Sequence, residues 1–265
     1  MENLRKSFSE ARPVRELTPQ QTLTLVGLAG LATLVIAVTP GLSLLNYPFR
    51  LLLTLVHELG HGLAALLTGG QFISFQIAAD GSGLAYTAGG WRFVVIPAGY
   101  LGVALFGAIL IRLGRNPRWS QIALGVIGAG ILLLGLRYAV PTIFSSQILS
   151  GLLTAATSLI FGLLFLAVAL KLPATWHVFL LHMLAIQAGL TAFSDLFAVI
   201  GLSTNFLNAP ANDARSMAQL TFIPAIVWAV VWAVAALVLI GGAIWLTWLA
   251  PHSTSDKLPK RSRRR

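Results

Sequence analysis

The residues with the clearest chemistry form a short motif inside an apolar stretch. His57, Glu58 and His61 lie in the run H-E-L-G-H, which fits the pattern H-E-x-x-H. On a helix, residues i and i+4 lie one turn apart on the same face, so the two imidazoles can bind one Zn²⁺. Glu58 can then act as general base on a water molecule activated by the metal. The motif therefore predicts metal-assisted hydrolysis.

The surroundings of the motif favour this interpretation. The flanking residues, LLLTLV before it and GLAALLTGG after it, are almost all apolar or small. Ionisable side chains deep in an apolar helix are energetically costly and are usually functional. The alternative is that these three residues only form polar contacts between helices. Helix packing gives no reason for three such residues within five positions, so we expect His57 and His61 as zinc ligands and Glu58 as the catalytic residue.

A catalytic zinc usually has three protein ligands, so a third ligand must be found. The chain has no Cys, which leaves His, Asp or Glu. A turn at Asp80-Gly81 explains Asp80, and Asp213 follows Asn212 at a helix start, where capping explains it. Asp195 lies in an apolar stretch with no such explanation. We expect Asp195 as the third ligand, with Asp213 as the alternative and His182 as a weaker one.

The composition indicates which environment surrounds these residues. Hydrophobic residues make up 57% of the chain and charged residues 10%, and the mean hydropathy is +0.83. A soluble globular domain carries about 25% charged residues. Most of the surface must therefore face lipid, which excludes a soluble globular enzyme and a disordered chain. The apolar runs are continuous rather than alternating, which also excludes a transmembrane β-barrel.

Seven apolar stretches approach the roughly 20 residues that cross a bilayer. They are 22–39, 43–68, 93–113, 119–138, 149–170, 174–202 and 219–249. Between the second and third, residues 69–91 alternate apolar and polar positions around the turn sequence Asp80-Gly81, which predicts a β-hairpin. Residues 203–218 read as a polar loop. The expected fold is an all-α polytopic membrane protein with about seven transmembrane helices and a short β-hairpin after the second.

The charges outside these stretches suggest the domain organisation. We expect a polar N-terminal tail (1–21), a single transmembrane metalloprotease-like domain (22–250) and a basic C-terminal tail (251–265). Six of the 18 Lys and Arg lie in the last segment. On a membrane protein such charges typically contact anionic lipid, so we expect the bilayer as a partner and no nucleic acid.

At these residues the chain resembles the site-2 protease family of intramembrane zinc metalloproteases. It is most similar to the small bacterial branch, in which an H-E-L-G-H helix precedes a Gly-rich hairpin. The resemblance rests on HELGH, on TGGQFISFQIAADGSG and on PAGYLGVALFGAIL, within residues 43–110. It implies that two His and one Asp bind zinc, that the Glu is catalytic, and that the hairpin receives an unfolded substrate strand.

Carried over residue by residue, the resemblance implies zinc ligands at His57, His61 and Asp195 and a catalytic Glu58. The chain departs from the family at the third ligand, because the family's Asp lies in L-D-G and Asp195 lies in S-D-L. No PDZ-like insertion is present.

Motif and resemblance together predict a zinc-dependent intramembrane protease. It would hydrolyse membrane-embedded or membrane-proximal protein or peptide substrates, in a bacterial inner (cytoplasmic) membrane or an equivalent internal membrane. One alternative is a non-catalytic membrane scaffold or assembly factor derived from such a protease. A metal or proton transporter is a further alternative, but it would need more intramembrane carboxylates than the sequence provides.

Overall fold

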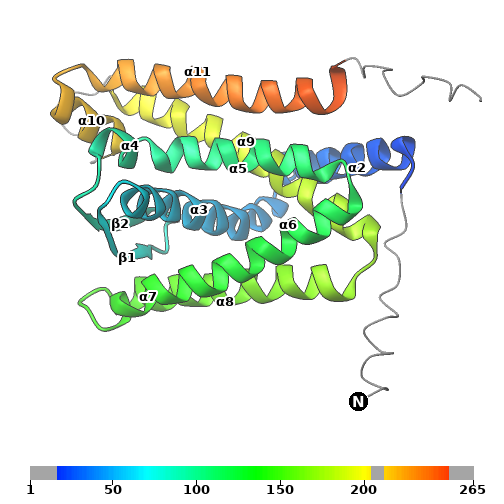
Figure 1. Cartoon of the computed structure of the whole chain (residues 1–265), viewed down its shortest axis with the longest axis horizontal. Coiled ribbons are helices and arrows are strands. Elements are labelled where there is room, and N and C mark those ends of the chain that lie inside the picture. Colours follow the sequence, from blue (N-terminus) through cyan, green and yellow to red (C-terminus); the bar gives the residue numbers. More distant parts are fainter. Residues whose placement is uncertain (1–16, 204–211, 251–265) are drawn as a thin grey trace, which may run out of the picture.

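A computed structural model describes residues 17–203 and 212–250, with the side chains of 43 and 195–203 excepted. The described elements, in chain order, are α2 (Pro19–Val38), α3 (Asn46–Leu67), β1 (Gln71–Ile77), β2 (Gly83–Ala88), α4 (Arg92–Val95), α5 (Ala98–Gly114), α6 (Pro117–Gly130), α7 (Leu136–Ile143), α8 (Ile148–Lys171), α9 (Ala174–Ser203), α10 (Asp213–Thr221) and α11 (Ala225–Ile244). Two π-helical segments, Ile131–Gly135 and Trp245–Leu249, join α6 to α7 and extend α11. Figure 1 shows most of the long helices running side by side.

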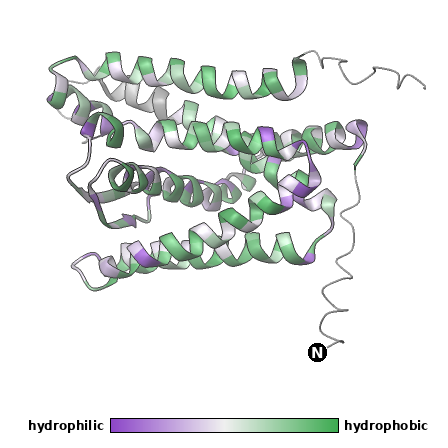
Figure 2. Ribbon diagram, in the orientation of Figure 1, coloured by the Kyte–Doolittle hydropathy of each residue, from purple (hydrophilic) through white to green (hydrophobic). Residues whose placement is uncertain are grey.

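Six described helical stretches are long and apolar enough to cross a membrane, and apolar residues cover most of their length (Figure 2). They are Pro19–Val38, Asn46–Leu67, Pro117–Ile143, Ile148–Lys171, Ala174–Ser194 and Ala225–Leu249. The seventh apolar helix, α5, has 17 residues, which gives it a length of about 25 Å and lets it cross most of the bilayer core. The expected fold class, a polytopic membrane protein with a hairpin, is confirmed.

Three of the expected helices begin later than their apolar stretches. One is α3, which begins at Asn46; the other two, α5 and α11, each begin after a proline. Pro97 precedes α5 and Pro224 precedes α11. Proline has no N–H to donate to the preceding turn, so it is favoured at the start of a helix, although α7 contains Pro141 in its interior. The expectation of a loop over 203–218 is wrong in its later part, because Asn212 caps a further helix, α10.

The central helix of the fold is α3, which lies between α5 on one side and α7 and α8 on the other (Figure 1). Its buried leucines belong to the main hydrophobic core: Leu51, Leu52, Leu53, Leu55 and Leu59. A Cβ atom on Gly60 would collide with the Ala98 carbonyl, so this glycine permits close approach of α5. The H-E-L-G-H segment is thereby held in the middle of the protein.

The predicted hairpin is present, with β1 and β2 paired antiparallel and Ile77 opposite Gly83. In its turn, the backbone N–H of Ala78 donates to the Ser82 carbonyl at 2.8 Å. The Asp80 carboxylate accepts hydrogen bonds from the backbone N–H and the hydroxyl of Ser82, at 2.9 and 2.7 Å. Gly81 has φ +82°, the left-handed conformation that favours glycine. The turn at Asp80-Gly81 is therefore confirmed.

One edge of the hairpin is fixed to α7 and α8. The Ile77 N–H donates to Thr154 Oγ1 of α8 at 2.7 Å, and Thr142 Oγ1 of α7 donates to the Phe75 carbonyl at 3.0 Å. These bonds satisfy backbone groups on the outer edge of β1. The sheet has two strands among the described residues, so the outer edge of β2 has no strand beside it. The hairpin thus presents β2 as its available edge.

We predict that Thr154→Val destabilises the protein by about 1–3 kcal/mol, because it leaves the buried Ile77 N–H without an acceptor. The free energy of unfolding in detergent measures this effect. Thr157→Val is the matched control, since the Thr157 hydroxyl donates only to its own helix, at the Leu153 carbonyl. Equal losses in the two variants would contradict the anchoring role of Thr154.

Candidate metal centre

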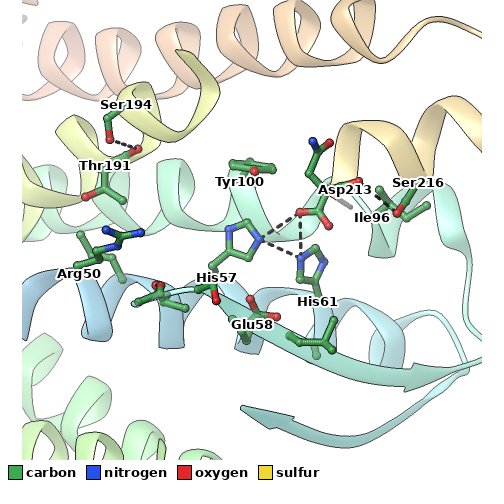
Figure 3. A pocket seen from close by; sticks show the side chains of 18 of the residues that line it. Arg50, His57, Glu58, His61, Ile96, Tyr100, Thr191, Ser194, Asp213 and Ser216 are labelled. Atoms are coloured by element: carbon green, nitrogen blue, oxygen red, sulfur yellow. Dashed lines mark hydrogen bonds and ion pairs between the residues drawn. The ribbon is translucent and has the colours of Figure 1, made fainter. Parts of the chain in front are cut away.

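A cavity of about 1280 Å³ opens between α3, the hairpin, α9 and α10. Figure 3 shows the side chains that face it, with His57, Glu58 and His61 on α3 and Asp213 opposite them. Small-molecule pockets usually have volumes of about 300–1,000 Å³. The cavity is larger than that, and residues of β2 line it.

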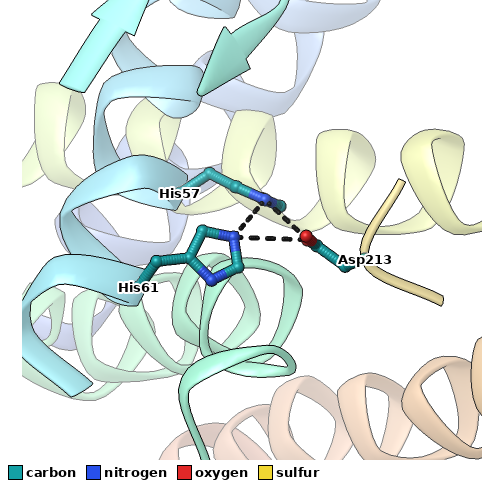
Figure 4. Close-up of side chains that lie close together, drawn as sticks. All are labelled: His57, His61 and Asp213. Carbon is teal, nitrogen blue, oxygen red and sulfur yellow. Dashed lines mark hydrogen bonds and ion pairs between the residues drawn. The ribbon is translucent and has the colours of Figure 1, made fainter. Parts of the chain in front are cut away.

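Three side chains converge on one point of this cavity (Figure 4). His57 Nε2 and His61 Nε2 lie 3.1 and 3.3 Å from the same Asp213 carboxylate oxygen, Oδ2. The two Nε2 atoms are 3.1 Å apart. Ligand atoms about 2.0–2.1 Å from a tetrahedral zinc ion are separated by roughly 3.3 Å. The donor set and its spacing therefore fit a zinc ion, with two imidazoles and one carboxylate as ligands.

Asp213 reaches the imidazoles because it is not the capping residue of its helix. The cap of α10 is Asn212, whose side chain accepts a hydrogen bond from the Arg215 N–H at 3.0 Å. The expectation that helix capping accounts for Asp213 is therefore wrong. Burial alone would raise the pKa of the Asp213 carboxyl, but the His61 and His57 imidazoles outweigh burial and hold that pKa below its ordinary value. The residue is thus an anion, as a metal ligand must be.

Asp195 and His182 were the other predicted candidates for the third ligand. Asp195 belongs to α9, but its side chain is outside the described residues, so its assignment as a ligand stays a prediction. His182 packs against Gly114, at the opposite end of α5 from Gly99. Fifteen helical residues separate these glycines, or about 22 Å. Because Gly99 touches the imidazoles, His182 is too far away to join them.

Residues from α4 and α5 hold the imidazoles in place. His61 Nδ1–H donates to the Val95 carbonyl at 2.7 Å, which leaves Nε2 as the ligand atom. The ring of Tyr100 packs edge-on against His57, with centroids 4.7 Å apart. A Cβ atom on Gly99 would collide with both Nε2 atoms. Tyr100 belongs to no recognisable sequence motif, so its contact with His57 could not be predicted from the sequence.

Glu58 occupies a separate position beside the three converging atoms. Its side chain is buried between α3 and β2, and a Cβ atom on Gly83 would collide with its carboxylate. Its oxygens are not among the atoms that converge at Asp213. Glu58 therefore lies next to the candidate metal position without being needed as a ligand, which is the placement required of a general base.

Comparison with known proteins shows the family of the chain. The family model described as Peptidase M50B-like matches residues 27–243. No curated protein and no solved structure matches the chain. The matched region includes the H-E-L-G-H helix, the hairpin and Asp213, and it confirms the resemblance to site-2 protease-like proteins. Since the match covers most of its length, the chain belongs to the Peptidase M50B-like family.

Proposed function

We propose that the protein is a zinc-dependent intramembrane protease whose metal ligands are His57, His61 and Asp213. The observation that carries the proposal is the convergence of their three ligand atoms at 3.1–3.3 Å. Zinc bound there would polarise the carbonyl of a peptide bond and lower the pKa of a water molecule to about 7. Proton transfer and substrate binding would be carried out by side chains and backbone groups of the protein.

Glu58 is proposed to move the proton. A carboxylate beside the reacting atoms can accept a proton from the attacking water and pass it to the leaving amine. Glu58 adjoins His57 in sequence and lies between α3 and β2, with 5% of the residue exposed. Its contact with Gly83 restricts how far its carboxylate can turn away from the cavity. The glycine and the buried helix together keep the base in position.

The free edge of β2 is proposed to hold the substrate. A helical segment has its carbonyls engaged in its own hydrogen bonds, so cleavage requires local unwinding. Unwound backbone groups in a membrane cost several kcal/mol each unless they find partners. Leu84, Ala85 and Thr87 of β2 line the cavity, so a substrate strand could add to this edge by main-chain hydrogen bonds. The same edge is held steady because β1 is tied to α7 and α8.

The alternatives are less well supported. A scaffold derived from a protease has no need of a buried carboxylate beside a three-ligand site, yet Glu58 is present there. A metal transporter needs further metal-binding groups along a pathway. Among the described residues, His57, His61 and Asp213 form the single group of three or more candidate ligands.

The setting of the site supports a proposal for the substrates. We propose membrane-embedded or membrane-proximal proteins as substrates, since the cavity lies among apolar helices. A bacterial inner membrane or an equivalent internal membrane is the proposed location.

We predict that Asp213→Asn and His61→Ala each lose zinc, because either change removes one of the three ligands. The loss of affinity should exceed the roughly 10- to 100-fold effect of removing a residue that only supports a ligand. Metal analysis of purified protein measures the zinc content. Asp195→Asn is the matched control and should keep its zinc. If Asp195→Asn loses zinc while Asp213→Asn keeps it, the ligand is Asp195.

We predict that Glu58→Gln retains zinc and loses about 10²–10⁴-fold in cleavage rate, because an amide keeps the shape of the side chain but cannot accept the proton. Zinc content and cleavage of a membrane substrate should be measured on the same preparation. Cleavage at the wild-type rate would show that Glu58 is not the base. Zinc binding without cleavage in the wild-type protein would favour the scaffold alternative.

A further inference from the structure

Arg50 lies on the same face of α3 as the candidate metal ligands. It precedes His57 by seven residues, which is close to two helical turns, and both side chains line the cavity. Figure 3 shows Arg50 and His57 extending from α3 toward the same opening. The arginine is therefore part of the cavity that contains the proposed reaction site.

The hairpin turn fixes the position of Arg50. On either side of it along α3, Tyr47 Oη donates to the Ala79 carbonyl at 2.7 Å and Thr54 Oγ1 donates to the Gly81 carbonyl at 2.8 Å. The stem of Arg50 packs against Gly81 between these two bonds, since a Cβ atom there would lie 2.6 Å from Arg50 Nε. The guanidinium group thus lies at the end of the cavity nearest the hairpin turn.

Within the described part of the chain, this guanidinium group has no hydrogen-bond acceptor or ion-pair partner. The salt bridges found there join Asp213 to His57 and His61. Two hydrogen bonds from Ser82 to one Asp80 oxygen lower the pKa of the Asp80 carboxyl in the turn, and the positive charge of Arg50 helps to lower it. The Arg50 and Asp80 side chains nevertheless form no salt bridge. A guanidinium presents five N–H donors in a planar fork that matches a carboxylate. Arg50 is exposed and lines the cavity, so it offers an anion-binding group at the rim of the cavity.

The distance from Arg50 to the proposed metal ligands can be converted into a number of residues of an extended substrate chain. Seven to eleven residues of α3 separate Arg50 from His57 and His61, which corresponds to about 10–16 Å along the helix. An extended chain rises about 3.3 Å per residue. A carboxylate bound by Arg50 would thus lie about three to five residues from the scissile bond. Antiparallel addition to β2 would place it on the C-terminal side of that bond, because β2 begins at Gly83, two residues after the Gly81 that contacts Arg50, and runs toward Ala88.

We propose that Arg50 is a specificity residue that binds an acidic group of the substrate, either a Glu or Asp side chain or a terminal carboxylate, three to five residues from the scissile bond. This proposal rests on the proposed protease function and adds a substrate class to it. Peptide is favoured over a lipid headgroup as the source of the anion, because Arg50 shares the cavity and the helix face of the metal ligands.

The test uses the full-length protein in bicelles and pairs of peptides that differ by Glu or Gln at one position, two to six residues on either side of the cleaved bond. The wild-type protein should prefer Glu at one such position by about tenfold in kcat/KM, the factor expected of one charge-assisted pair. Arg50→Gln should abolish this preference, and Arg50→Glu should prefer Lys at the same position. Arg92→Gln is the control, since Arg92 is the other arginine lining the cavity, and it should keep the preference for Glu.

A binding measurement separates this proposal from the proposed function. In the Glu58→Gln background, the affinity for the Glu peptide should exceed that for the Gln peptide, and Arg50→Gln should remove the difference. If no peptide is cleaved by the wild-type protein but this difference in binding persists, the protease function fails and the role of Arg50 stands. If Arg50→Gln affects Glu and Gln peptides equally in both assays, or acts only through anionic lipid in the bicelle, the proposal is overturned.

Discussion

The contact between one carboxylate oxygen of Asp213 and the two imidazoles of α3 is the interaction on which the site depends. It joins residues 156 positions apart in the chain and brings α10 against the central helix. Polar and charged groups inside an apolar protein are destabilising unless they are paired or bound to metal. The contact satisfies this requirement for three ionisable residues at once. It also arranges their ligand atoms at the separations that a tetrahedral ion requires, so one geometry serves both the fold and the proposed chemistry.

The rest of the structure holds this contact in a usable position. Small residues allow α5 and the hairpin to approach α3 closely, with Gly99 against the imidazoles and Gly83 against Glu58. The hydroxyls of Thr142 and Thr154 occupy one edge of the hairpin, so the opposite edge, along β2, remains open toward the cavity. Arg50 extends the same face of α3 beyond the ligands. A single helix therefore carries the two imidazoles, Glu58 and Arg50, and the hairpin lies alongside it.

Local sequence signals predicted most of the fold. Continuous apolar runs identified the membrane helices, and the alternation around Asp80-Gly81 identified the hairpin, because both patterns follow directly from the spacing of side chains on helices and strands. His57, Glu58 and His61 were recognisable as a site for the same reason. The proposed third ligand, Asp213, was harder to predict, because its approach to the imidazoles depends on how α10 packs against α3. Asp213 was expected to cap a helix, whereas the preceding Asn212 performs that role. The contacts of Tyr100 and Arg50 likewise arise from tertiary packing and leave no local pattern.

The division into tails and one domain stays a prediction, since residues 1–16 and 251–265 lie outside the described part.

X-ray absorption spectroscopy at the zinc edge, on the purified wild-type protein, tests the central claim most directly. The structure predicts one tightly bound zinc per chain, with two imidazole nitrogens at about 2.0–2.1 Å and a carboxylate oxygen at about 2.0–2.2 Å in its coordination shell. A shell with three or more imidazoles, or a protein that binds no zinc under metal-replete conditions, would contradict the assignment of His57, His61 and Asp213 as the metal site.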